Sequence, residues 1–185
     1  LITNTTINKE VAEEINKIFF EVIIAPAYDA DALEVLQQKK NRIILIRKDC
    51  KTCPMQFRSL LNGVLMQEKD LSIQGKADLE PMTDKQPTAS EVEDLLFANK
   101  IVKNSKSNAI TLVKNKQLCA SGIGQTSRVD SLRQAIEKAK SFGFDLNGAV
   151  MASDAFFPFP DNIKRALKSG VCYVAQPAAP FGTTW

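Results

Sequence analysis

Three polar segments between residues 107 and 161 each adjoin a short apolar run, and this arrangement restricts the possible folds more than any other feature of the chain. The segments begin at Ser107, Ser121 and Ala152. Short apolar runs are typical of buried strands, and α/β proteins bind their ligands where strands meet loops or helices. We therefore expect an α/β fold in which these segments form a site for a flat, anionic ligand.

Residues 1–48 alternate the sequence patterns of helices and strands. Asn8 is a suitable N-cap for a first helix, and strands are predicted at residues 21–26 and 42–47, with a second helix between them. The first helix is expected to bury four apolar positions that share one face: Val11, Ile15, Ile18 and Phe19. Helices and strands that alternate in this way predict an α/β layer.

Residues 49–87 are polar and rich in turn-forming residues, so they are predicted to connect two halves of the chain. Within them, Asn62-Gly63 favours a hairpin turn between two short strands. The α/β pattern returns in residues 88–185. Strands are predicted there at residues 109–114, 117–123, 148–152 and 171–175.

The helices of residues 88–185 have recognisable start signals. Thr88 and Glu91 have the spacing of a capping box, and Ser127 or Thr126 can cap a second, longer helix. A third helix is predicted at residues 162–168. The longer helix is expected to turn one apolar face inward: Val129, Leu132, Ala135, Ile136, Ala139 and Phe142.

The composition limits the chemistry available to this chain. Its 185 residues include no histidine, which is the usual general base near neutral pH and the commonest nitrogen ligand of metals. The net charge of +3 is spread along the chain without a basic stripe, so we expect no nucleic-acid partner. No apolar run approaches the ~20 residues of a membrane span, so we expect no membrane partner either.

The four cysteines include the pair Cys50-Lys51-Thr52-Cys53. A CxxC pair occurs in redox and zinc sites, but it is more simply explained here as two reduced loop thiols, in keeping with a cytoplasmic protein. A four-thiolate zinc site would also need Cys119 and Cys172, and both lie in strand-like apolar runs. We therefore predict no metal site.

A glycine turn lies before the longer helix. Gly122 and Gly124 would leave free backbone amides near a helix N-terminus, which suits a phosphate or carboxylate. Arg128, at the first helical position, would add a bidentate contact to the same anion. Such turns are also common for purely steric reasons, so this alternative stays open.

An aromatic segment and an asparagine complete the candidate site. The rings of Phe156, Phe157 and Phe159 would form a wall against a flat heterocycle, with Asp161 accepting hydrogen bonds from the ligand. Alternatively, the rings fill the core beneath a loop. Asn108 would either present its amide to a ligand or close a turn.

At these residues the chain resembles the transformylase domain of the bifunctional AICAR transformylase/IMP cyclohydrolase family, in its bacterial form. Four runs carry the resemblance: Glu21-Val22-Ile23-Ile24-Ala25-Pro26, Lys106-Ser107-Asn108-Ala109, Gly122-Ile123-Gly124-Gln125-Thr126-Ser127-Arg128-Val129-Asp130-Ser131 and Ala152-Ser153-Asp154-Ala155-Phe156-Phe157-Pro158-Phe159. The resemblance implies a cytidine-deaminase-like, three-layer α/β architecture. Residues 1–48 would end a first subdomain, residues 49–87 would connect, and residues 88–185 would form most of a second.

The resemblance also implies an activity in purine (IMP) biosynthesis. The amine of 5-aminoimidazole-4-carboxamide ribonucleotide (AICAR) would attack the formyl carbon of 10-formyltetrahydrofolate, in a cytoplasmic homodimer with active sites at the subunit interface. Four residues would contact the nucleotide: Asn108, Arg128, Asp161 and Glu21. Phe156 and Val129 would border the folate, which is the co-substrate.

The chain departs from the family in one respect that concerns catalysis. The family's catalytic Lys-His pair lies upstream of the matched runs, so we expect this chain to be a later portion of a transformylase with no catalytic residue of its own, inactive alone. A non-catalytic nucleotide-binding or dimer-assembly module is the alternative. A zinc deaminase, suggested by fold kinship and by Cys50 and Cys53, is disfavoured because the chain has no His-x-Glu segment.

Overall fold

A computed structural model describes residues 1–49, 51 and 53–178. The chain divides into two compact units, Leu1–Asp70 and Leu71–Trp185, and each is described by itself. The division at Asp70 falls inside the segment that we predicted as a connector, and the subdomain boundaries at 48 and 87 remain predictions. Among the described residues, every helix is too short or too polar to span a bilayer.

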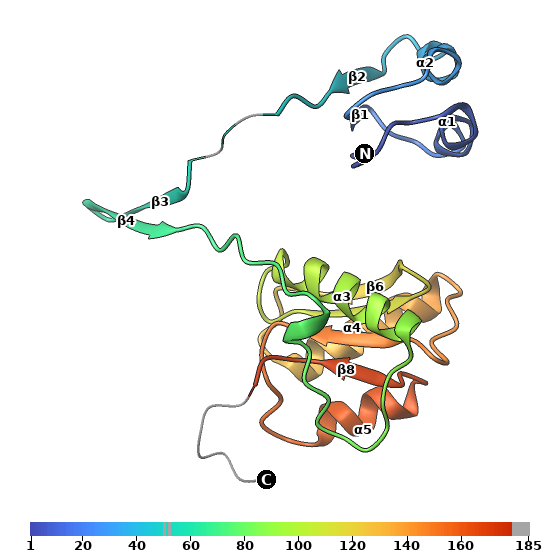
Figure 1. Cartoon of the computed structure of the whole chain (residues 1–185). Helices are drawn as coiled ribbons and strands as arrows, with labels where there is room; N and C mark the ends of the chain where they lie inside the picture. Colours follow the sequence, from blue (N-terminus) through green and yellow to red (C-terminus); the bar gives the residue numbers. More distant parts are fainter. Residues whose placement is uncertain (50, 52, 179–185) are drawn as a thin grey trace. The chain divides into compact units, whose positions relative to one another are not determined.

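The first unit contains a small parallel sheet with two helices (Figure 1). The sheet and its helices are α1 (Lys9–Asn16), β1 (Val22–Ala25), α2 (Ala30–Gln37) and β2 (Ile43–Ile46), and the same unit also contains a hairpin. Asn8 caps α1 as predicted, because its side chain accepts a hydrogen bond from the Val11 amide at 3.0 Å. The buried core of these elements consists of Ile7, Ala12, Ile23, Ala25, Ala32 and Leu36.

The predicted buried face of α1 is wrong. Val11 is 42% exposed, Ile18 51% and Phe19 90%. The helix ends at Asn16, so the last two of these residues lie beyond it, and Ala12 takes the buried position that Val11 was expected to hold. Of the four predicted residues, only Ile15 packs against the core.

The predicted hairpin is confirmed. β3 (Met55–Leu60) and β4 (Gly63–Glu68) pair antiparallel, and Leu60 lies opposite Gly63. The two turn residues are therefore Leu61 and Asn62, one position earlier than expected. Leu61 takes the left-handed conformation with a φ of 50°.

The second unit has a four-stranded sheet in the order β6-β5-β7-β8, with helices on both faces (Figure 1). β5 pairs antiparallel with β6 and β7, and β7 pairs parallel with β8. Its elements are the short 3-10 helix Lys76–Asp78, α3 (Ala89–Lys103), β5 (Ile110–Lys114), β6 (Gln117–Gly122), α4 (Arg128–Ser141), β7 (Val150–Ser153), α5 (Asp161–Lys168) and β8 (Tyr173–Ala175). The mixed α/β class is confirmed, and the cytidine-deaminase-like architecture stays a prediction.

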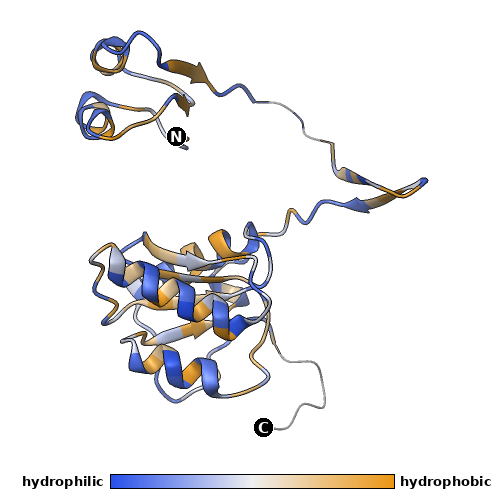
Figure 2. Cartoon of the chain, turned by 180° about the vertical axis from the view of Figure 1, so that it is seen from behind, coloured by the Kyte–Doolittle hydropathy of each residue, from blue (hydrophilic) through white to orange (hydrophobic). Residues whose placement is uncertain are grey.

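Each face of this sheet has its own buried core. α3 covers one face through Leu95, Ala98 and Val102, and α4 and α5 cover the other (Figure 2). The α4 side buries Leu132, Ala135, Ile136 and Ala139, as predicted. Phe142 is an exception at 66% exposed, because α4 ends at Ser141 and Gly143 turns the chain away with a φ of 74°.

The predicted caps of the second unit are present. Thr88 and Glu91 form the capping box of α3, with the Thr88 amide donating to the Glu91 carboxylate at 2.7 Å. Ser127 caps α4 by accepting from the Asp130 amide at 3.1 Å. These side chains satisfy amides that have no partner inside the helix.

Asp94 fixes the turn between β5 and β6. This buried carboxylate of α3 accepts from the amides of Asn115 at 2.8 Å and Lys116 at 2.6 Å. Both turn residues have positive φ, at 54° and 59°, as a two-residue turn between antiparallel strands favours. A charged group on a helix therefore holds a strand-to-strand turn in place.

The segment that precedes α3 is attached to β8, the last strand. The hydroxyl of Tyr173 donates to the Gln86 carbonyl at 2.7 Å, and the Lys85 ammonium lies 4.9 Å from the centre of the Tyr173 ring. Nearby, the Cys172 thiol donates to the Glu91 carboxylate at 3.6 Å. The segment that precedes α3 and the strand β8 are thus held together.

Candidate functional site

The candidate site lies at one end of the four-stranded sheet, where β5 begins and β6 and β7 end. The register establishes this, because Ile110 pairs with both Gly122 and Ser153. The polar segments that begin at Ser107 and Ser121 and the one that ends β7 therefore meet at the same end. The sequence prediction that these segments converge is confirmed.

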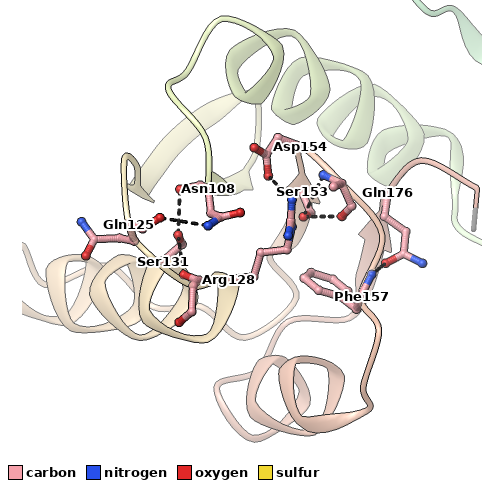
Figure 3. Close-up of polar contacts among 10 residues, drawn as sticks. Asn108, Gln125, Arg128, Ser131, Ser153, Asp154, Phe157 and Gln176 are labelled. Carbon is pink, nitrogen blue, oxygen red and sulfur yellow. Dashed lines mark hydrogen bonds and ion pairs between the residues drawn. The ribbon is translucent and has the colours of Figure 1, made fainter.

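Asn108 is held in place from several sides (Figure 3). Its side-chain nitrogen donates to the Gln125 carbonyl at 2.9 Å, and its own carbonyl accepts from the Ser131 hydroxyl at 2.8 Å. These bonds join the start of β5 to the glycine turn and to α4. This bond uses one of the two side-chain N–H groups, so Asn108 can still offer a ligand its side-chain oxygen as an acceptor and its second N–H as a donor.

Arg128 begins α4 and points toward Asp154, which follows β7 (Figure 3). The Arg128 Nη2 atom lies 3.5 Å from the Asp154 Oδ1 atom, and the two side chains are 24% and 11% exposed. Arg128 Nε and Asp154 Oδ1 are buried without a hydrogen-bond partner among the described residues. Buried polar atoms are normally satisfied, so this pair has capacity for further hydrogen bonds once a ligand or water is bound.

The glycine turn has a largely steric function. A Cβ atom on Gly122 would lie 1.9 Å from the Ser131 carbonyl oxygen, so only glycine allows β6 to approach α4 this closely. The Gly124 amide donates to the Lys106 carbonyl at 2.8 Å, and the Gln125 amide donates to the Asn108 carbonyl at 3.4 Å. The Gly124 amide is therefore not free, contrary to the expectation, and Arg128 supplies a cation beside this turn.

The three phenylalanines of the aromatic segment differ in burial, so only part of the segment fills the core. Phe157 is 4% exposed and fills the core under α4 and α5, whereas Phe159 is 68% exposed. Phe156 is half-buried. The Phe157 amide donates to the Gln176 side-chain oxygen at 3.0 Å (Figure 3), so a residue beyond β8 fixes this loop.

The other predicted site residues occupy three different places. Val129 is the second residue of α4 and is half-buried beside Arg128. Asp161 is the exposed first residue of α5, and its carboxylate accepts from the adjacent Asn162 amide at 2.8 Å. Glu21 is exposed in the first unit, just before β1, so its relation to the others stays a prediction.

Sequence reasoning did not assign Asp154 and Gln176 to the site. Asp154 had a usable signal, since it is an acidic residue directly after an apolar strand and in the same run as Phe156. Gln176 had none, because its contact with Phe157 spans 19 residues and depends on how β8 is placed. Long-range contacts of this kind do not follow from local patterns.

The thiols do not converge in the part of the chain that the structure describes. Cys50 lies outside the described residues, and Cys53 is exposed. Burial raises the pKa of both Cys119 and Cys172, which pack in opposite faces of the sheet. Among the described residues, no group of three or more Cys, Asp or Glu side chains is placed to hold a metal ion.

The fold and the candidate site define a mixed α/β protein with an asparagine and an arginine brought together at one end of its larger sheet. Over residues 1–138 the chain matches the model of a family described as "AICARFT/IMPCHase bienzyme". This match covers well over half of the chain, which therefore belongs to that family. The resemblance found from the sequence motifs is confirmed.

Curated relatives agree with the family match. The chain is 73% identical over 177 residues to the bifunctional purine biosynthesis protein PurH of Bacteroides thetaiotaomicron, 46% identical over 175 residues to that of Chlorobium phaeobacteroides, and 47% identical over 174 residues to that of Aquifex aeolicus. The matches cover 94–96% of the chain but only 33–35% of each relative. The chain thus spans about a third of the length of these relatives.

Proposed function

We propose that this chain is part of an AICAR transformylase, which moves a formyl group from 10-formyltetrahydrofolate to the amine of AICAR in IMP biosynthesis. The observation that carries the proposal is the placement of Asn108 and Arg128 at one end of the sheet, within the motifs shared with the family. Asn108 supplies a hydrogen-bond acceptor for an N–H group of an aminoimidazole nucleotide, and Arg128 supplies a cation for one of its oxygen atoms.

The proposed roles follow from the atoms that each residue has available. The Asn108 side-chain oxygen would accept from a nucleotide N–H group, and Arg128 would bind an anionic or carbonyl oxygen of the nucleotide. Asp161 and Glu21 would add further nucleotide contacts, and Phe156 and Val129 would border the folate. Orientation by such contacts is a large part of catalysis, because an aromatic amine is a weak nucleophile that must be held against the formyl carbon.

Proton transfer would rely on the Lys-His pair that the resemblance to the family implies, upstream of the matched runs. The chain has no histidine to form that pair, and the Asp154 carboxylate beside Arg128 is engaged in an ion pair. The chain would therefore bind nucleotide without turning it over, and the catalytic pair would come from the rest of the enzyme. In the whole enzyme, a homodimer would complete each active site at the subunit interface.

Calorimetric titration of AICAR into this chain tests the proposal. Wild type should bind, and Arg128→Ala should weaken binding by about tenfold or more, because a hydrogen bond to a charged group contributes about 1.5–3 kcal/mol. Arg133→Ala is the matched control, since it removes an exposed arginine from the same helix and should leave the affinity unchanged. Failure of the wild type to bind, or equal losses in both variants, would refute the assignment of this site.

A further inference from the structure

A second region of the molecule, between α4 and α5, carries a concentration of positive charge. A groove of about 460 Å³ lies there. It is lined by Ile136, Lys140, Asp161, Lys164, Arg165, Lys168 and Ser169. Of the site residues discussed above, only Asp161 is among these seven.

The groove residues of α5 form a continuous stripe. Asp161, Lys164, Arg165 and Lys168 are spaced i, i+3, i+4 and i+7, so they share one face of the helix. Lys140 of α4 lines the same groove. Four cations and one carboxylate give the groove a formal charge of +3, and none of the four cations forms an ion pair with a described residue.

Helix electrostatics explain only part of this pattern. Lys140, Arg165 and Lys168 lie in the last turns of their helices, where the macrodipole favours cations. Lys164 lies in the first half of α5, where the dipole disfavours a cation, and it is four residues from Lys168, a like-charge spacing that is mildly destabilising. A bound anion would remove both penalties.

We propose that this groove binds a polyphosphate anion, meaning a compound with two or more linked phosphate groups. The Arg165 guanidinium can bind phosphate oxygens in a bidentate manner, and the lysine ammonium groups act as point charges beside it. Asp161 repels an anion at one end of the groove, so the phosphates lie toward Lys168 and Lys140. This groove shares only Asp161 with the proposed nucleotide-binding residues, does not include Arg128 or Asn108, and goes beyond the proposed function.

Titration of inorganic pyrophosphate into the whole chain, followed by calorimetry at low salt, tests the proposal. Wild type should bind, and added NaCl should weaken the binding. The double variant Lys164→Gln/Lys168→Gln should lose about tenfold or more in affinity, since two charge-assisted contacts are removed. Circular dichroism confirms that this variant, which changes only exposed side chains, is folded.

Two further variants distinguish binding in the groove from a general effect of charge and from binding at Arg128. Lys100→Gln/Lys138→Gln removes the same charge from exposed lysines outside the groove and should change the affinity less than about twofold if binding is local. Arg128→Ala should bind pyrophosphate as wild type does, whatever happens to AICAR binding. The proposal is overturned if wild type does not bind, if both double variants lose affinity equally, or if Arg128→Ala alone abolishes binding.

Discussion

Replacement of Gly122 by alanine tests how closely β6 and α4 must approach to form the candidate site. The new Cβ atom would lie 1.9 Å from the Ser131 carbonyl oxygen and 2.9 Å from the Ser131 Cα atom. Non-bonded atoms are normally separated by about 3.5 Å, so strand and helix would have to separate by roughly 1.5 Å. All the contacts are with main-chain atoms, so no change of rotamer can relieve them.

The expected cost is about 3 kcal/mol, at or above the upper end of the usual range for overpacking. With an m-value of about 1.5 kcal/mol/M, the urea midpoint of the second unit should fall by about 2 M. Displacement of α4 should also break the bond from the Ser131 hydroxyl to the Asn108 carbonyl, so AICAR binding should weaken even where the variant is folded.

Gly75→Ala is the control, because its Cβ atom would meet only the Asp78 side chain, at 3.9 Å. The free energy of unfolding of this variant should lie within about 0.5 kcal/mol of the wild-type value, as is usual for surface substitutions. If Gly122→Ala shifts the midpoint no more than Gly75→Ala does, the close approach of β6 to α4 does not exist and the steric function of the glycine turn is wrong.

Three other predictions concern the second unit. Asp94→Ala should cost about 2–4 kcal/mol in urea unfolding, because two turn amides lose a charged acceptor; an unchanged midpoint would show that the buried carboxylate is not what holds the turn. The hydrogen bond from the Thr88 amide lowers the pKa of Glu91, so wild type should be more stable than Glu91→Gln at pH 7. This stability advantage should disappear as the pH falls from about 4.5 through the lowered pKa. Urea midpoints of both proteins at several pH values measure the advantage, and a difference that does not change with pH would contradict the prediction. Burial raises the pKa of Cys172, so iodoacetamide at pH 8 should modify the exposed Cys53 before it modifies Cys172. Mass spectrometry of timed samples gives the order in which the two thiols react. Faster modification of Cys172 would contradict its burial.

Local signals predicted much of the fold. Asn8, Thr88 and Ser127 cap helices as expected, because a cap depends on a few neighbouring residues. Burial was predicted less well, because it depends on where a helix ends. Phe19 and Phe142 both lie beyond the last turn of their helices, and the periodic pattern does not contain this information.

The candidate site was predictable in its location but not in its bonding. The positions of Asn108 and Arg128 follow from motifs beside strands, so convergence at one end of the sheet could be anticipated. The partner of Arg128 could not, because Asp154 is 26 residues away in sequence and reaches it only through the pairing of β5 with β7. The steric function of Gly122 was also not predictable, because it depends on how closely β6 packs against α4.

The attachment of Tyr173 to Gln86 has a consequence for biosynthesis. The partners are 87 residues apart, and β8, which pairs with β7, is the last strand of the described chain. On the ribosome, α3, β5 and β6 emerge early, but the second unit cannot close until residues 173–175 have left the exit tunnel. Until then the edge of β7 that pairs with β8 stays unpaired for several seconds of translation, at typical synthesis rates of about 5–20 residues per second, and chaperones would have their best access to it in that interval.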